Sequence, residues 1–141
     1  MKKSILFFTL FFIFLNSYSQ TIFGIWESRD EKTNKIDSFI EVYKKGRKAY
    51  AKVIDIVDKN GQNTVCDKCK GENKNKPILG MNILYGLTKK ESEWSDGEIL
   101  DPRNGKKYTC YIKLVGKNKL KIRGYIGFAL FGRTTYWYRK K

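Results

Sequence analysis

Apolar and polar residues alternate along most of this chain, and no segment shows the sustained 3.6-residue period of an amphipathic helix. In residues 107–115 every second side chain is apolar or aromatic, and these side chains are Tyr108, Cys110, Ile112 and Leu114. Residues 119–123 alternate in the same way between cationic and aliphatic side chains. The pattern indicates strands of an antiparallel sheet with one buried face and one face in water.

Strand-like runs are separated by short segments rich in glycine, asparagine and aspartate. The runs cover residues 21–28, 36–44, 48–57, 81–88, 97–100, 107–115, 119–126 and 133–139. The residues between them favour the left-handed backbone angles of hairpin turns, so consecutive strands should pair as a meander. An open sheet of this kind would leave bare edges, which closure removes. We therefore predict an all-β fold, a single antiparallel up-and-down β-barrel of about eight strands.

The N-terminal segment has the features of a secretory signal peptide. Two lysines precede an apolar run at residues 5–15, and small serines follow at positions 17 and 19. The run has eleven residues, short of the ~20 that a membrane-spanning helix needs. We expect residues 1–19 to be removed and residues 20–141 to form a single domain, exported to the periplasm or the extracellular space. The mature chain would have no transmembrane segment; an uncleaved N-terminal anchor is the alternative.

The chain is strongly basic, and its formal charge of +15 falls to +13 when residues 1–19 are removed. Such a charge attracts phosphates, acidic polysaccharides or anionic lipid headgroups. The basic residues are spread over turns and strand faces, and they form no dense basic helix or arginine-aromatic platform. We expect a lysine-rich exposed surface, an anionic envelope component as a candidate partner, and no nucleic-acid partner.

Cys66 and Cys69 have C-x-x-C spacing in a loop between two strand-like runs. A thioredoxin-type redox centre requires the first cysteine at a helix N-terminus within a βαβ unit. A structural zinc site requires four ligands, and without histidine it would need all three cysteines and a carboxylate. Export instead favours a disulfide between Cys66 and Cys69, which would stiffen a long loop beside the barrel mouth. We expect no metal and no cofactor. Cys110 is then a buried free thiol, unless it pairs with one of the other two.

The absence of histidine excludes Ser-His-Asp and Cys-His hydrolysis and H-E-x-x-H metalloprotease sites. Asp96, Glu98 and Asp101 form an acidic cluster near an aromatic residue, and paired carboxylates can hydrolyse a glycosidic bond. These residues also fit ordinary roles, because both aspartates lie in turn-forming pairs and Glu98 alternates outward from Ile99. We favour a protein without enzymatic activity and keep a hydrolase that uses these carboxylates as the alternative.

The two ends of the predicted barrel resemble a calycin or lipocalin-like pattern. In that pattern a G-x-W near the start lies at the barrel floor beneath a basic side chain of the last strand. The matching residues here are Gly24, Trp26 and Arg139. The resemblance implies a cation–π contact that closes one end of the barrel; a plain core aromatic is the alternative role for Trp26.

Several motifs, taken in order, resemble the domain of unknown function 2147 family of small exported bacterial proteins. They are GIW at 24–26, CDKCKG at 66–71, PILGMNIL at 77–84, WSDGEILDPRNGKKY at 94–108, LKIRGYIG at 120–127 and GRTTYW at 132–137. The resemblance covers essentially the whole mature chain. It implies a calycin-like barrel and export, and it assigns no function.

We interpret the chain as an exported, non-enzymatic binding or envelope-associated barrel that holds a small apolar or acidic amphiphilic ligand. The candidate ligand-binding residues are Trp26, Tyr50, Trp94, Arg123, Tyr125, Trp137 and Arg139. Arg123 or Arg139 would neutralise an acidic head, because arginine matches carboxylate and phosphate geometry. Besides the hydrolase, the alternative is a lysine-rich surface interaction protein.

Residues 123–132 mix glycines with large apolar side chains. Apolar loop residues that are exposed together indicate an interaction site, such as an apolar lid or a membrane-contacting loop. They can equally fold inward and plug the barrel, because eight-stranded barrels either fill their interior or hold one small ligand. The sequence leaves these alternatives open.

Overall fold

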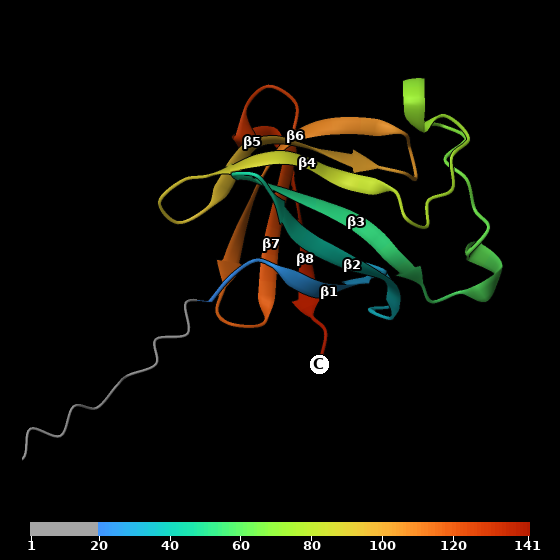
Figure 1. The fold of residues 1–141 in the computed structure, drawn as a ribbon, viewed down its shortest axis with the longest axis horizontal. Coiled ribbons are helices and arrows are strands. Elements are labelled where there is room, and N and C mark those ends of the chain that lie inside the picture. Colours follow the sequence, from blue (N-terminus) through green and yellow to red (C-terminus); the bar gives the residue numbers. More distant parts are fainter. Residues whose placement is uncertain (1–19) are drawn as a thin grey trace, which may run out of the picture.

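The chain folds into a closed barrel of antiparallel strands (Figure 1). We describe it from a computed structural model, in which residues 20–141 are described; the predicted signal peptide lies outside them. The strands are β1 Gly24–Arg29, β2 Ile36–Lys45, β3 Lys48–Ile56, β4 Asn82–Lys89, β5 Trp94–Asp101, β6 Lys106–Val115, β7 Lys119–Tyr125 and β8 Arg133–Arg139. Each strand pairs with its neighbour in sequence, and β1 pairs with β8. The predicted all-β, up-and-down barrel is confirmed.

The connections divide the barrel into two ends. Short turns join β2 to β3, β4 to β5 and β6 to β7, and Gly46 and Gly116 in two of them have φ angles of 61° and 70°. Glycine adopts these angles without the cost that a Cβ adds. The other four connections surround the opposite, open end and hold the 3-10 helices η1 Lys59–Gly61, η2 Gly71–Asn73 and η3 Ala129–Phe131. Among the described residues, no helix has the length and apolar character needed to cross a bilayer.

Trp26 closes the end that carries the short turns. Its side chain is fully buried, and its indole Nε1 donates a hydrogen bond to the carbonyl oxygen of Ile22 at 2.8 Å. The guanidinium carbon of Arg139 lies 4.3 Å from the centroid of the Trp26 ring. The predicted cation–π contact between the first and last strands is therefore confirmed.

Arg139 also ties the segment before β1 to the barrel. Its Nη2 donates to the carbonyl oxygen of Thr21 at 2.8 Å, its Nη1 to that of Phe23 at 3.4 Å and its Nε to that of Lys117 at 3.0 Å. A Cβ at Gly24 would lie 3.3 Å from Nη1 of this arginine. The glycine of the G-x-W motif therefore leaves room for the guanidinium.

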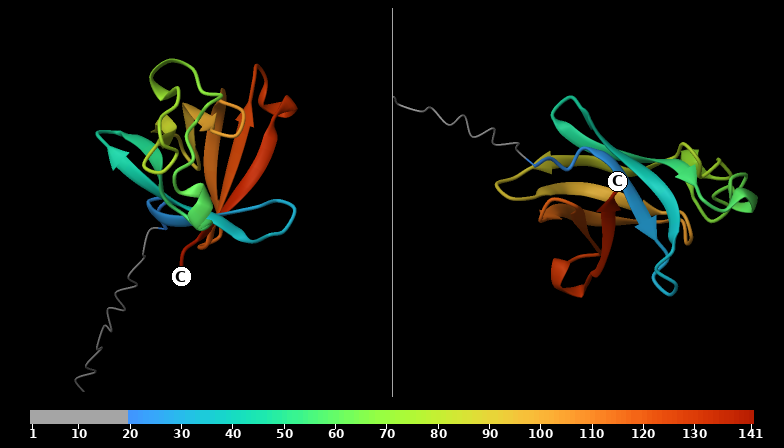
Figure 2. Two further views of the ribbon diagram at one scale, coloured as in Figure 1. Left: turned by 90° about the vertical axis from the view of Figure 1, so that its right-hand side faces the viewer. Right: turned by 90° about the horizontal axis from the view of Figure 1, so that it is seen from below.

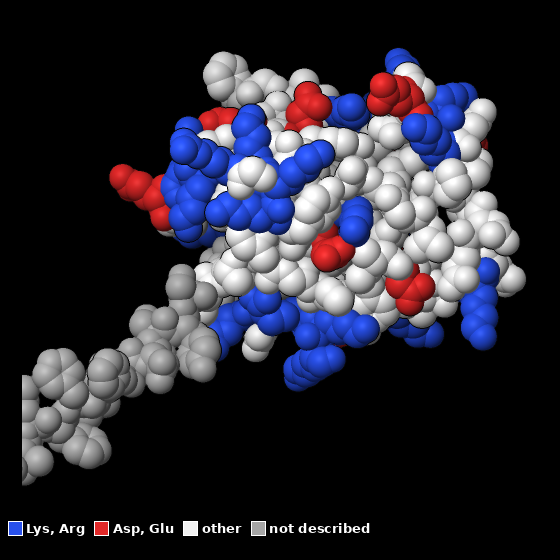
Figure 3. Space-filling model, viewed as in Figure 1, with Lys and Arg blue, Asp and Glu red and all other residues white. Residues whose placement is uncertain are grey.

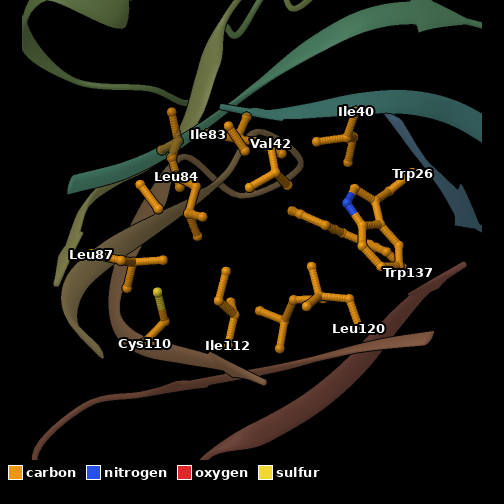
Figure 4. Close-up of a cluster of buried hydrophobic side chains, with 14 of the residues drawn as sticks. Trp26, Ile40, Val42, Ile83, Leu84, Leu87, Cys110, Ile112, Leu120 and Trp137 are labelled. Atoms are coloured by element: carbon orange, nitrogen blue, oxygen red, sulfur yellow. The ribbon is translucent and has the colours of Figure 1, made fainter. Parts of the chain in front are cut away.

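Apolar side chains from every strand fill the interior (Figure 4). The buried hydrophobic residues of the strands are Trp26, Ile40, Val42, Ala49, Ala51, Val53, Ile83, Leu84, Leu87, Trp94, Leu100, Cys110, Ile112, Leu120, Ile122 and Trp137. The alternation predicted for β6 and β7 is confirmed at Cys110, Ile112, Leu120 and Ile122, all of which are buried. Burial of these side chains supplies most of the driving force for folding.

The connection between β3 and β4, residues 57–81, is the longest and packs beside the open end (Figure 1, green). Within it Cys66 and Cys69 form the predicted disulfide, and both cysteines are buried. A Cβ on Gly105, in the turn between β5 and β6, would lie 2.0 Å from the carbonyl oxygen of Lys68. The disulfide loop therefore packs backbone to backbone against a turn of the open end.

Candidate functional site

A cavity of about 650 Å³ occupies the open end of the barrel, and all four connections at that end contribute to its lining. Its apolar lining includes Ile40, Val53, Ile83, Ile99, Leu100, Ile122 and Trp137. Its hydroxyl-bearing side chains are Ser28, Ser38, Thr64, Tyr108, Tyr125 and Thr135. Small-molecule sites typically occupy about 300–1,000 Å³ and combine an apolar lining with a few polar groups. The size and chemistry of this cavity match that description.

The cavity exists because strand positions near the open end carry small residues. The small residues in its lining are Ser28 on β1, Ser38 on β2, Gly124 on β7 and Thr135 on β8. A Cβ at Gly124 would lie 3.5 Å from side-chain atoms of both Ile99 and Tyr108, which is an ordinary van der Waals distance. The nearest atoms are side-chain atoms, so no backbone fills the space in front of this glycine. Toward the closed end the same strands carry Trp26 and Leu120, which fill the interior.

Charged residues of the connections form the rim of the cavity. Arg103 donates from Nε to Asp101 Oδ1 at 3.0 Å and from Nη2 to Asp101 Oδ2 at 3.1 Å, and Arg133 pairs with Glu31. Burial raises the pKa of Asp101, but the hydrogen bonds from Arg103 outweigh it and hold that pKa below its ordinary value. The hydrogen bond to Asp101 in turn raises the pKa of Arg103. The rim therefore stays charged at neutral pH and presents guanidinium groups above an apolar interior.

Two of the seven predicted ligand-binding residues line this cavity, namely Tyr125 and Trp137. Trp137 is buried in the wall, and Tyr125 is half-buried where β7 ends at the mouth. Trp26 and Arg139 instead lie at the closed end, in contact with each other. Tyr125 therefore lies at the mouth, whereas Trp137 lies deeper in the barrel, opposite Leu120 on β7 and beside Trp26 (Figure 4).

Tyr50 lies on the outer face of the barrel. It is flanked in β3 by Ala49 and Ala51, which are both fully buried, so its side chain points the other way. Its ring stacks on the ring of Tyr43 with a centroid distance of 5.9 Å. Tyr50 therefore contributes to outer packing between β2 and β3 and is not part of the cavity lining.

Trp94 lies at the closed end, beside a second cavity of about 400 Å³. Its ring makes an edge contact with Phe23 at a centroid distance of 5.4 Å. The lining of this cavity mixes basic and acidic side chains, namely Lys44, Arg47, Lys89, Lys113, Glu91 and Glu93. Lysine and arginine are densest on the visible surface over the ends of β2, β3 and β4 (Figure 3), so the surface around this second cavity is strongly basic.

Arg123 lies outside the cavity lining and holds the connection between β7 and β8. Its Nε donates to the carbonyl oxygen of Ala129 at 2.9 Å, and its Nη2 to that of Leu130 at 3.0 Å. Its Nη1 donates to the hydroxyl of Thr134 at 2.9 Å. The guanidinium is thus used within the fold, and it is not presented to the cavity as we expected.

The residues that line the rim in its place are Arg103 and Arg133, which we did not single out in the sequence. A signal for both was present in the sequence. Arg103 lies within a turn segment and Arg133 directly follows one, and the meander brings these two segments to the same end. Sequence alone could not rank them above the many other basic residues. The order of strands in the barrel makes them neighbours of the cavity.

The acidic cluster does not converge on one cavity. Asp101 lines the cavity at the open end, whereas Asp96 and Glu98 are exposed and are not among its lining residues. Asp96 forms an ion pair with Lys90 at 2.9 Å. Each carboxylate therefore has a separate environment, and the paired arrangement that the hydrolase alternative needs is not formed at this cavity.

Cys110 is a buried free thiol, as predicted. Its side chain lies in the core among Leu87 and Ile112 (Figure 4). Burial, and then the carboxylate of Glu98, raise the pKa of this thiol to about 12. The thiolate is the reactive form of cysteine, so this side chain acts as a small apolar core residue.

Comparison with known proteins gives a family and a fold. Comparison with curated proteins finds no match. Among solved structures, the chain is similar to protein HP1028 from the human pathogen Helicobacter pylori, described as belonging to the lipocalin family. The two share 22% sequence identity with a TM-score of 0.74, over 86% of this chain and 84% of that chain, which shows a common lipocalin-like barrel. The family model described as "Uncharacterized protein conserved in bacteria (DUF2147)" matches residues 24–139, from the first strand to the last, and the chain belongs to this family.

Proposed function

We propose that the mature chain is an exported binding module that holds one small apolar or amphiphilic ligand in the cavity at the open end. The cavity itself is the observation that supports this proposal, with about 650 Å³ of space above an apolar floor. A ligand that removes this lining from water gains about 25 cal/mol for each Å² of apolar surface buried. Eight-stranded barrels of this kind have room for one small ligand.

The arrangement of polar groups suggests how such a ligand would lie. Its apolar part would contact Ile122 and Trp137, and its head would lie at the rim. An acidic head would be neutralised by Arg133, whose side chain is 65% exposed, in place of the 48% exposed carboxylate of Glu31 with which Arg133 pairs. Arg103 makes two hydrogen bonds to Asp101, which is more buried, and is less easily released. In this proposal Arg133 takes the part that we first gave to Arg123 or Arg139.

A matched pair of substitutions tests the proposal. Thr135→Phe fills the cavity from β8, whereas Thr109→Phe makes the same change at an exposed position of β6. Titration of each variant with the apolar fluorescent probe N-phenyl-1-naphthylamine measures its affinity. We expect Thr135→Phe to weaken binding by about tenfold or more, which is about 1.4 kcal/mol, and Thr109→Phe to leave it unchanged.

The same assay tests the acidic head. Dodecanoate and dodecanol differ only in the head group, so competition of each against the probe isolates the contribution of Arg133. Arg133→Gln should weaken dodecanoate and leave dodecanol unchanged. Absence of probe binding to the folded wild type, or equal binding by the two phenylalanine variants, would contradict the proposed function.

A further inference from the structure

Four large apolar side chains protrude together into solvent at the open end. They belong to the connection between β7 and β8 and are Ile126, Phe128, Leu130 and Phe131, each 71–80% exposed. No other large apolar side chain of the described residues is more than 48% exposed. Figure 2 shows this connection, drawn in orange and red, extending away from the barrel wall. The sequence left open whether these side chains plug the barrel, and the structure leaves them exposed to solvent at its mouth.

Several backbone groups at the tip of this connection have hydrogen-bond partners within the protein. The guanidinium of Arg123 donates to the carbonyl oxygens of Ala129 and Leu130, at 2.9 and 3.0 Å. The amide of Phe131 donates to the carbonyl oxygen of Phe128 at 3.1 Å. Polar backbone groups enter an apolar medium at low cost only when they have partners. These partners lower the cost of bringing the tip of the connection into contact with hydrocarbon.

The charge around the connection indicates the kind of partner. Residues 124–132 contain no charged residue, although charged residues make up 30% of the chain, and Arg123 and Arg133 bracket this stretch. Arginine matches phosphate geometry. The formal charge of +13 on residues 20–141 adds attraction to an anionic surface. An exposed apolar segment between two arginines fits an anionic lipid layer, which has an apolar interior and negative headgroups, better than it fits a pocket on another protein.

We propose that residues 126–131 insert into the surface of a lipid bilayer that contains anionic lipids, with Arg133 at the level of the headgroup phosphates. Apolar side chains at an interface reach about 5–10 Å into the boundary between headgroups and acyl chains. Ile126 and Phe131 also line the large cavity, so insertion brings the cavity mouth to the membrane surface. An apolar ligand then passes between bilayer and cavity without crossing water; this step rests on the proposed function, whereas the docking does not.

A tryptophan reporter tests the insertion directly. The three native tryptophans are all buried, so Phe128→Trp introduces one exposed indole at the tip. Val115→Trp is the matched control, because Val115 is 45% exposed at the opposite end of the barrel. With phosphatidylcholine vesicles that contain phosphatidylglycerol, we expect the emission of Phe128→Trp to shift to shorter wavelength and to be quenched by brominated acyl chains. The emission of Val115→Trp should remain unchanged.

Vesicle sedimentation measures the contribution of the apolar tip. The double variant Phe128→Ser, Leu130→Ser should partition at least about tenfold more weakly than the wild type, and Val115→Ser should partition as the wild type does. Raising the salt from about 0.1 M to about 1 M shortens the Debye length from about 10 Å to about 3 Å and should weaken binding of both forms. Vesicles of phosphatidylcholine alone should bind less protein than the anionic vesicles.

Three outcomes overturn the docking proposal. The first is equal partitioning of the wild type and the double serine variant, which would assign binding to lysines elsewhere. The second is no binding to either kind of vesicle. The third is a blue shift of Phe128→Trp that depends on protein concentration without vesicles, which would identify the tip as a contact between copies of the chain. Titration with N-phenyl-1-naphthylamine in the absence of vesicles tests the cavity separately, so the two proposals can fail independently.

Discussion

Replacing Gly105 with alanine tests whether the disulfide loop packs against the open end of the barrel as described. A Cβ at this position would lie 2.0 Å from the carbonyl oxygen of Lys68 and 2.7 Å from the amide nitrogen of Cys69. Both are backbone atoms of a loop that the Cys66–Cys69 disulfide closes. They cannot rotate away as the end of a flexible side chain would, so the loop or the turn must move.

The chain offers a matched control at Gly116. Its φ angle is 70° and that of Gly105 is 71°, but a Cβ at Gly116 would meet nothing within 4 Å. Alanine in this left-handed conformation costs about 1–2 kcal/mol at either position. Overlap at Gly105 adds about 1–3 kcal/mol, as overpacking does elsewhere. We therefore expect Gly105→Ala to lower the free energy of unfolding by about 2–5 kcal/mol and Gly116→Ala by about 1–2 kcal/mol.

Urea unfolding of both variants, with the slope checked for constancy, measures the two losses. For a chain of this length, 1 kcal/mol corresponds to a shift in Tm of about 3–5 °C. Reduction of the disulfide frees the loop, so the difference between the two variants should shrink under reducing conditions. Equal losses in the oxidised variants would refute the backbone-to-backbone packing of the loop on the turn.

Two further predictions concern the closed end and the core. Arg139→Ala removes a cation–π contact and three hydrogen bonds and should lower the free energy of unfolding by about 2–3 kcal/mol. Arg103→Ala removes an ion pair at the exposed rim and should lower the free energy of unfolding by no more than about 1 kcal/mol. Similar urea midpoints for these two variants would contradict the role of Arg139. Cys110 should resist iodoacetamide at about pH 8 in the folded protein and react after unfolding, because burial raises its pKa to about 12; intact mass distinguishes the two cases. Since the unfolded thiol ionises near its ordinary pKa of 9.0, the folded state should lose stability as the pH rises from there toward 12, and Cys110→Ala should remove that part of the loss.

Local alternation was sufficient to predict which side chains of β6 and β7 point inward. Cys110, Ile112, Leu120 and Ile122 are buried as expected, because successive side chains of a strand point to opposite faces. We expected Tyr50 to contact a ligand, whereas the same rule, applied to its buried neighbours Ala49 and Ala51, places it on the outer face. The two-residue alternation of the strand was the better predictor of the direction of this side chain.

The position of a residue along the barrel axis was not predictable in this way. Trp26, Trp94 and Trp137 are all buried, yet only Trp137 lines the cavity at the open end. Register shifts between β3 and β4 and between β5 and β6 change which positions face each other. Such register shifts depend on the packing of the completed barrel, and they have no simple signature in the amino-acid sequence.

By itself, the sequence determined the strands, their inner and outer faces and the antiparallel closure, because each of these follows from side-chain alternation and turn residues close together in the chain. The compartment expected for an exported chain likewise led to the Cys66–Cys69 pair. Only the tertiary structure decided that small residues of β1, β2, β7 and β8 meet to leave a cavity, that Arg103 and Arg133 surround it, and that the apolar tip at residues 126–131 points outward. These features join residues that are distant in sequence, and their positions depend on the register of the whole barrel and on which long connections pack at one end.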